Sequence, residues 1–271
     1  MQDNQHAHHI DRVRSYWNQA SCGTEFIQEE KFSVDYFAAI EAFRYAIESD
    51  IFSFAQFTRY HKKKVLEVGV GAGTDFIQWV RAGAYAYGID LTQEAINNTR
   101  KRLALEHLSA SYLDVADAQK LPFAANFFDL IYSWGVIHHA PSMTDCLQEM
   151  VRVTKPNGTM KIMVYNRNSL FAFYQYLIHG VKKGKPFSRW KDIIYNHQES
   201  FGTQAFSQQE MRCLLAYYPV TIMNIQSPIT AHDLLYYKSL PYQYGASLLE
   251  VLAGWQKAGW YMMIELKKNA S

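Results

Sequence analysis

The sequence predicts a doubly wound α/β fold, with seven strands in a mostly parallel sheet. Three observations lead to this prediction. From about residue 61 onward, short β-branched and aliphatic runs alternate with amphipathic segments, as crossover helices between parallel strands require. Three glycines at alternate positions, Gly69, Gly71 and Gly73, follow the first run, and Asp90 ends the second. Turns and polar side chains at the carboxyl ends of strands are where such sheets bind ligands.

Hydrophobic periodicity gives the elements of this region in chain order. We predict strands at 64–69, 84–90, 110–115, 127–133, 160–166, 220–226 and 260–266, and helices at 74–82, 93–107, 143–153 and 208–217. Thr92 is a typical N-cap residue, with Glu94 in the first turn of its helix. Ser207 and Glu210 have the spacing of a capping box. Asn157 is expected in the left-handed conformation, which Asn tolerates.

Residues 1–60 precede this region and are expected to form an N-terminal helical cap, too short to be a separate domain. Residues 1–9 are polar, and we predict that they are unstructured. His6, His8 and His9 have no Cys or acidic partner at ligand spacing, so we predict no metal site. The rest of the cap carries apolar residues at helical spacing.

Composition is that of one large domain with additions. The chain has 271 residues, of which 49% are hydrophobic, enough for a sizeable core. Its 27 basic and 25 acidic side chains leave a charge of +2, which argues against a nucleic-acid surface. We find no apolar run long enough to span a membrane and no signal peptide. With three cysteines that form no C-x-x-C pair, we expect a cytoplasmic protein with reduced thiols.

Two aromatic segments interrupt the regular pattern, at about 166–206 and 229–259. They follow strands whose carboxyl ends lie beside the glycine turn, and ordinary core is the alternative interpretation. Because the strands already supply apolar faces, we favour the interpretation that these segments form a lid that covers a binding pocket. Aromatic walls would suit an aromatic, prenylated or lipid-like molecule, and the rings could attract a cation.

The glycine turn indicates a nucleotide-like cofactor. Glycines permit positive φ and let a ligand lie against bare backbone, and the helix that follows offers unpaired N–H groups. The spacing departs from the dinucleotide pattern G-x-G-x-x-G, because Thr74 stands where a glycine is wanted. The phosphate-loop pattern is absent. Asp90 lies 21 residues after Gly69 and could accept both hydroxyls of a ribose; an exposed loop aspartate is the alternative.

Four motifs follow one another along the chain: Glu67-x-Gly69-x-Gly71-x-Gly73, Asp90, DVADAQKLPF at 114–123 and SWGVIHHAP at 133–141, with DCLQEMVRVTKPNGTM after them. Together they resemble the class I S-adenosylmethionine (SAM) methyltransferases, of the small-molecule type found in ubiquinone and menaquinone biosynthesis. The resemblance covers about residues 61–165. It implies a Rossmann-like fold for 61–271, SAM as cofactor and S-adenosylhomocysteine as product.

The resemblance also implies roles for individual residues. The expected cofactor-binding residues are Glu67, Gly69, Gly71, Gly73 and Thr74 around the methionyl part, Asp90 and Leu91 at the ribose, Asp117 and Ala118 at the adenine, and Ser133 and Trp134 beside the sulfonium. The N/D-P-P-Y/F sequence of enzymes that methylate base amines is missing, because the fourth strand ends in SWG. We therefore expect a small-molecule acceptor, methylated on O, N or C, and no nucleic-acid partner.

His138 and His139 are the candidate catalytic bases, since an imidazole titrates near neutrality. Neighbouring residues of an extended loop point in opposite directions. We expect His138 to face the methyl group and His139 to pack on helix 143–153, although both histidines could instead be structural. Glu199 and the tyrosines of the insertion are further candidates. The competing functions are a non-catalytic SAM-binding protein and a nicotinamide-dependent oxidoreductase.

Overall fold

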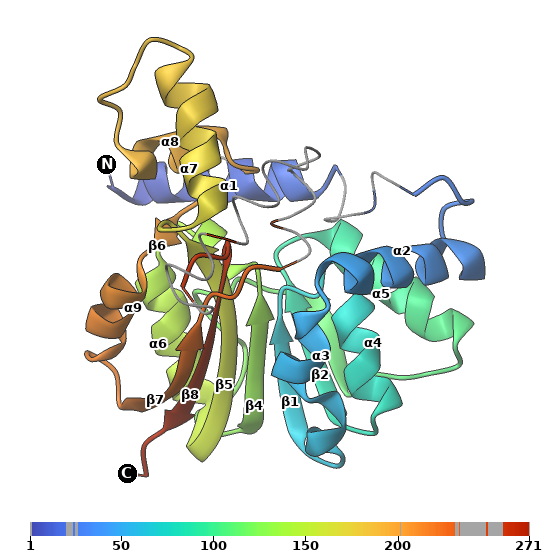
Figure 1. The fold of residues 1–271 in the computed structure, drawn as a ribbon. Coiled ribbons are helices and arrows are strands. Elements are labelled where there is room, and N and C mark those ends of the chain that lie inside the picture. Colours follow the sequence, from blue (N-terminus) through green and yellow to red (C-terminus); the bar gives the residue numbers. More distant parts are fainter. Residues whose placement is uncertain are drawn as a thin grey trace.

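The computed structural model describes residues 2–19, 24, 27–200, 202–230, 233, 248 and 257–270. Its strands lie in one mixed sheet with the order β3-β2-β1-β4-β5-β8-β7 (Figure 1). Their bounds are β1 (Lys64–Val68), β2 (Tyr85–Asp90), β3 (Tyr112–Val115), β4 (Phe128–Trp134), β5 (Thr154–Asn166), β6 (Ala205–Phe206), β7 (Val220–Gln226) and β8 (Tyr261–Lys268). β1 to β5 are parallel, and β8 is antiparallel to β5 and β7. The predicted mostly parallel α/β class is confirmed.

Helices cover both faces of this sheet (Figure 1). Their bounds are α1 (Gln2–Trp17), α2 (Val34–Ile47), α3 (Asp50–Ala55), α4 (Thr74–Arg81), α5 (Gln93–Leu105), α6 (Met143–Val153), α7 (Leu170–Tyr176), α8 (Trp190–His197) and α9 (Gln208–Leu215), with short helices η2 (Phe57–Tyr60), η3 (Ile137–His139) and η4 (Leu177–Val181). Strand alternation sends Val65 into a core with α3, α4 and α5, and Leu66 into a core with α6 and α9. The sheet is therefore wound on both sides.

Local signals in the sequence explain several boundaries. Thr92 caps α5 by accepting the Ala95 N–H at 3.3 Å, and Ser207 and Glu210 form the predicted capping box of α9. Asn157 has φ of 63°. These three local predictions are confirmed, because each depends on a short-range hydrogen bond or on one backbone dihedral.

Two expectations differ from the structure. α1 begins at Gln2, although residues 1–9 are predicted to be unstructured. The insertion 166–206 holds α8 and β6 where an irregular stretch is predicted, and β6 pairs with β5. Its aromatic helix α7 runs into the π-helical turn η4. The second predicted insertion, 229–259, falls mostly on residues outside those that the structure describes.

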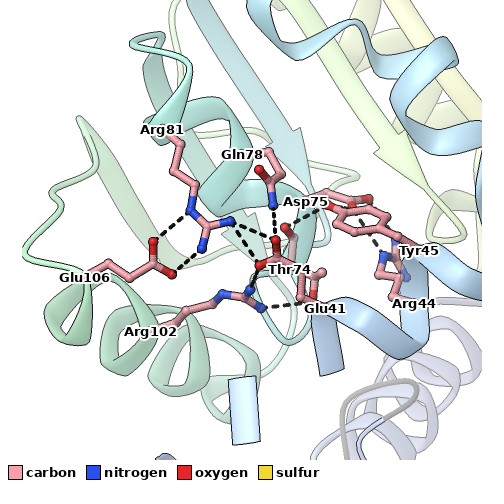
Figure 2. A network of polar contacts seen from close by, with 9 residues as sticks. All are labelled: Glu41, Arg44, Tyr45, Thr74, Asp75, Gln78, Arg81, Arg102 and Glu106. Carbon is pink, nitrogen blue, oxygen red and sulfur yellow. Dashed lines mark hydrogen bonds and ion pairs between the residues drawn. The ribbon is translucent and has the colours of Figure 1, made fainter. Parts of the chain in front are cut away.

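A network of charges fixes α2 against α4 and α5 (Figure 2). Glu41 of α2 accepts hydrogen bonds from Gln78 and Arg81 of α4 and from Arg102 of α5. The side chain of Arg102 is only 1% exposed, and burial lowers its pKa. One turn further along α2, Arg44 binds Asp75 at the start of α4. These ion pairs hold the N-terminal cap beside the glycine turn.

Candidate active site

A cavity of about 740 Å³ opens at the carboxyl ends of β1, β2, β4 and β5. Side chains of α1 and α2 close it on the opposite side. Its volume lies in the range of small-molecule sites. The glycine turn and the acidic strand ends line one half. Aromatic side chains together with aliphatic ones line the other, here called the aromatic half.

The glycine turn leaves room for a ligand at one of its three glycines. All three have positive φ, at 83° for Gly69, 52° for Gly71 and 78° for Gly73. A Cβ on Gly69 would lie 2.2 Å from the Val136 side chain, whereas a Cβ on Gly71 would meet no heavy atom within 4 Å. Gly71 is therefore where a ligand can approach bare backbone. Gly73 does not line the cavity, and it packs against Thr99 instead.

Asp90 lies at the end of β2 and lines the same half of the cavity. Its Oδ2 atom accepts the Gly71 N–H at 3.1 Å, and its Oδ1 atom accepts the N–H and hydroxyl of Thr92, each at 2.9 Å. Burial raises the pKa of Asp90, while these hydrogen bonds act in the opposite direction. A carboxylate has about four acceptor positions, and these hydrogen bonds already use three of them.

The loop after β3 brings Asp117 and Ala118 to the cavity, beside Leu91. The Oδ1 atom of Asp117 accepts the Gln119 N–H at 2.9 Å, and the Gln119 side-chain amide donates to both carboxylate oxygens. An exocyclic amine at this place would share the carboxylate with Gln119. This acidic edge is the one that the sequence motif predicts.

Glu67 and Thr74 complete this half of the cavity. Glu67 is 3% exposed and accepts the Trp79 Nε1–H at 2.8 Å. Burial, and then the nearby Asp75, raise the pKa of Glu67 well above its usual value. Asp75 itself accepts two hydrogen bonds from Arg44, at 3.1 and 2.8 Å. Arg44 therefore offsets the charge of Asp75 beside Glu67.

Ser133 and Trp134, the expected neighbours of a sulfonium, point to opposite faces of β4. Trp134 lines the cavity. Ser133 is fully buried and does not line it, because successive side chains of a strand alternate between faces. The structure therefore does not place the Ser133 side chain where the sequence motif predicts it.

The places of the two histidines are the reverse of those expected from the sequence. His139 lines the cavity, whereas His138 is fully buried behind it. The centroid of the His138 ring lies 4.0 Å from that of the Tyr165 ring. Residues 137–139 form a 3₁₀ turn, in which side chains turn by about 120° per residue, so the alternation of an extended loop does not apply. Among the described residues, neither ring nitrogen of His138 has a hydrogen-bond partner. Burial lowers the pKa of His138 well below its usual value.

Polar groups hold His139 at the cavity wall. Its Nδ1 atom lies 2.9 Å from the Ser200 hydroxyl and 3.0 Å from the Thr203 hydroxyl. Its Nε2 atom lies 3.4 Å from the Glu199 carboxylate. An imidazole oriented in this way, next to a carboxylate, can hold or move a proton at the cavity surface.

The aromatic half contains residues that motif spacing does not identify. Its apolar wall comes from Ile10, Val13 and Trp17 of α1, Phe43 and Ile47 of α2, and Met163 of β5. The Tyr165 hydroxyl donates to Glu199 at 2.9 Å, and the Tyr261 hydroxyl donates to Glu48 at 2.9 Å. Glu48 follows the end of α2 and Tyr261 begins β8, and no sequence motif marks either residue. Of these residues, only Tyr165 could be found from the sequence, because it lies near the carboxyl end of a predicted strand.

No described helix is long and apolar enough to span a bilayer. Nor do the described residues contain a group of three or more His, Cys, Asp or Glu side chains that could hold a metal ion.

Comparison with known sequences identifies a protein family that matches part of this chain. Residues 66–162 match a family described as a methyltransferase domain. Methyltransferase GfsG of Streptomyces halstedii is 33% identical over 102 residues, which cover 36% of each chain. Malonyl-[acyl-carrier protein] O-methyltransferase of Enterobacter lignolyticus is 28% identical over 107 residues, 40% of this chain and 41% of that one. The chain spans about two fifths of the length of the curated relatives it matches.

Solved structures share the fold over nearly the whole chain. Geranyl diphosphate C-methyltransferase of Streptomyces coelicolor, solved with Mg²⁺, geranyl diphosphate and S-adenosylhomocysteine, has a TM-score of 0.65 at 14% identity and covers 96% of this chain and 97% of that one. A SAM-dependent methyltransferase of Aquifex aeolicus has a TM-score of 0.54 at 14% identity, covering 88% and 99%. At such low identity these matches show the fold.

Proposed function

We propose that this chain, which carries a class I SAM-dependent methyltransferase domain, transfers a methyl group to a small, largely apolar acceptor. One observation carries the proposal: a single cavity has the residues of the cofactor motifs at one end and an aromatic chamber at the other. Two substrates that react with each other need such a continuous space, because methyl transfer requires close and aligned approach.

The residues at the first end fit the cofactor. The open space at Gly71 and the nearby Glu67 suit the methionyl part, Asp90 and Leu91 suit the ribose, and Asp117 suits the adenine amine. The cofactor, when bound, supplies an activated methyl group on a positively charged sulfur. Trp134 lies where the cofactor half meets the aromatic half, and we assign it the wall beside that methyl group.

The chain's own contribution is to bind the acceptor, exclude water and accept a proton. Apolar side chains of α1 and α2 cover the cavity, which keeps water from the reacting atoms. His139 and Glu199 meet at 3.4 Å on the cavity surface. We assign to this pair the acceptance of a proton from the acceptor, a role for which the sequence alone favours His138.

The apolar lining supports an acceptor with an aromatic, prenyl or lipid-like body. Val13, Phe43, Ile47 and Met163 offer contact area without charge. The relatives act on different molecules: one is named for geranyl diphosphate and another for malonyl-[acyl-carrier protein]. The proposal therefore covers methylation on O, N or C. A cytoplasmic location and the absence of a nucleic-acid substrate remain sequence-based predictions.

A labelled-methyl assay with metabolite extracts tests this proposal. The protein is incubated with SAM carrying a labelled methyl group, and products are identified by mass. We expect one labelled small molecule and the release of S-adenosylhomocysteine. Binding of S-adenosylhomocysteine without transfer to any extract would favour a non-catalytic SAM-binding protein. Stabilisation by NAD(H) in place of S-adenosylhomocysteine would favour an oxidoreductase.

A further inference from the structure

The insertion 166–206 projects from the edge of the sheet at which β5 ends. Its helix α7 continues without a break into η4, and Figure 1 shows this helix extending beyond α1 and away from the sheet. The turn that follows leads into α8, where the Trp190 ring packs on the rings of Phe173 and Tyr176, with centroids 5.8 and 5.7 Å apart. Residues 181–192, which join η4 to the first turn of α8, are here called the tip of this projection.

The tip is an ordered turn that leaves one aromatic ring in water. The Lys185 N–H donates to the Gly180 carbonyl at 2.9 Å, and the Tyr176 hydroxyl donates to the Pro186 carbonyl. Phe187 follows Pro186 directly, and its side chain is 98% exposed. No other large apolar side chain of the described residues is exposed to this extent. The fold therefore holds this ring outward at a defined place.

A row of exposed apolar side chains runs along the projecting helix. Phe173, Leu177 and Val181 are between 36% and 44% exposed. Residues four apart on a helix lie on the same face, one above the other. The projection therefore presents an apolar row on one face of its helix and Phe187 in its tip. Grouped apolar exposure of this kind is typical of an interaction surface.

The tip also concentrates positive charge. It holds five of the chain's 27 basic side chains and one of its 25 acidic ones, a net charge of +4, although the whole chain has only +2. The one acidic residue of the tip, Asp192, already binds Arg189 at 2.9 Å. The remaining cations are lysines with exposed side chains: Lys182, Lys183, Lys185 and Lys191. The projection is therefore the basic part of a chain that is otherwise slightly acidic.

We propose that the tip and the apolar row bind the projection to the surface of an anionic lipid bilayer. Phe187 enters the boundary between headgroups and acyl chains, and the lysines contact the headgroup phosphates. Lysine stems are long and flexible enough to keep their charge at the headgroups while the ring lies deeper. A nucleic acid would use the lysines, but it would leave the apolar row in water. Exposed rings next to lysines therefore favour a bilayer as the partner.

This inference goes beyond the proposed function and does not depend on the identity of the methyl acceptor. It does bear on how an acceptor reaches the site. α8 begins within the tip at Trp190 and ends at His197, and the next residue, Gln198, lines the cavity. A helix of this length spans only about 12 Å. A bilayer bound at the tip therefore holds the cavity close to the lipid, where a lipid-like acceptor dissolves.

Co-sedimentation of the full chain with lipid vesicles tests the inference. One set of vesicles is phosphatidylcholine alone, and the other contains about one third phosphatidylglycerol, which is anionic. We expect the protein to partition onto the anionic vesicles at least about tenfold more strongly at about 0.1 M salt. This partition should fall at least about fivefold at about 1 M salt, because salt screens the lysines. Equal partition onto both kinds of vesicle, or no binding to the anionic ones, would overturn the inference.

Variants of the tip identify the groups that bind. Changing Lys182, Lys183 and Lys185 together to Gln should weaken partition onto the anionic vesicles at least about tenfold. Phe187→Ser should weaken it at least about fivefold, whereas Phe187→Trp, which keeps an aromatic ring, should retain it. Because Phe187 is 98% exposed, its replacement removes little packing. Unchanged partition in either the lysine variant or Phe187→Ser would overturn the inference.

Matched controls carry the same changes elsewhere on the surface. Lys62 and Lys63 precede β1 and Lys267 lies near the end of β8, all three exposed, at the edge of the sheet opposite the cavity. Changing these three lysines to Gln removes the same charge as the tip variant. Tyr217→Ser removes another exposed ring, 87% exposed after α9. Both controls should bind the anionic vesicles normally, and a loss as large as that of the tip variants would overturn the inference.

Further measurements separate a bilayer site from other outcomes. A single-stranded oligonucleotide that binds more tightly than the anionic vesicles, and that requires the tip lysines, would identify a nucleic-acid site instead and overturn the inference. Melting temperature shows whether each variant is folded. If the triple variant does not fold, Phe187→Ser and the salt dependence of the unaltered protein still decide. Vesicle binding needs neither SAM nor an acceptor, so its failure leaves the proposed function standing, and a failure of methyl transfer leaves this inference standing.

Discussion

The backbone N–H of Gly71 donates a hydrogen bond to Oδ2 of Asp90 at 3.1 Å. This bond joins the turn after β1 to the end of β2. It fixes the carboxylate beside the one glycine of the turn whose missing Cβ leaves open space. The two motifs therefore form a single surface, on which a methionyl group and a ribose can lie next to each other.

The glycines of this turn should respond differently to the same substitution. Gly69→Ala places a Cβ 2.2 Å from Val136, so we expect the free energy of unfolding to fall by about 1–3 kcal/mol. Gly71→Ala meets no heavy atom, so its left-handed backbone costs only about 1 kcal/mol. Its methyl group should instead lower S-adenosylhomocysteine affinity at least about tenfold. Denaturant unfolding and calorimetry measure both effects. Normal affinity in Gly71→Ala would show that no ligand approaches this backbone.

Substitution of the histidines should separate a member of the proton-accepting pair, His139, from a packing residue, His138. His139→Ala removes the imidazole at the cavity wall, and we expect kcat with the identified acceptor to fall by about 10²–10⁴-fold. His138→Ala removes a fully buried ring, and it should lower the free energy of unfolding by about 1–3 kcal/mol with kcat nearly unchanged. The measurements are kcat at saturating SAM and chemical unfolding. If His138→Ala lowered kcat and His139→Ala lowered only the free energy of unfolding, His138 would be the base instead.

Removing the partner of a buried cation should destabilise the N-terminal cap. Glu41→Ala leaves the buried Arg102 guanidinium without its carboxylate, and we expect the free energy of unfolding to fall by about 3 kcal/mol. Glu106→Ala breaks the more exposed pair with Arg81 and is the matched control, expected to cost less than about 1 kcal/mol. Equal losses in the two variants would mean that burial of Arg102 is not what makes the network stabilising.

Lys161 should make stability depend on alkaline pH. It is 1% exposed on β5 and donates to the Phe54 carbonyl of α3, and burial lowers its pKa to about 8. Because the folded pKa lies below the unfolded value, the unfolded state binds more protons above about pH 8, so this group's contribution to stability rises until the unfolded lysine also titrates. The stability gained by Lys161→Met should be roughly 2 kcal/mol larger at pH 7 than at pH 9.5. Lys267→Met, exposed on β8, is the control. A gain independent of pH would contradict the lowered pKa.

Short-range signals explain why much of the fold could be predicted. The sheet strands, the Thr92 cap and the glycine turn each follow from periodicity or from contacts within a few residues. α8 has no side-chain cap at its N-terminus. No capping signal therefore marks where this helix begins.

The acceptor half of the site could not be predicted, because its parts meet only in the folded protein. Glu48 and Tyr261 are 213 residues apart and come together through the antiparallel strand β8. The orientation of His139 depends on a 3₁₀ turn that replaces the expected extended loop. Motif spacing carries information about the cofactor half alone, since those residues follow consecutive strands.

Calorimetric titration of the protein and of Asp90→Ala with S-adenosylhomocysteine tests the central claim most directly. Asp90 forms the carboxylate surface at the end of β2, and each charge-assisted hydrogen bond is worth about 1.5–3 kcal/mol. The account predicts micromolar binding to the unaltered protein and at least about a tenfold loss of affinity in Asp90→Ala. Absence of binding to the unaltered protein, or equal affinity in Asp90→Ala, would contradict it.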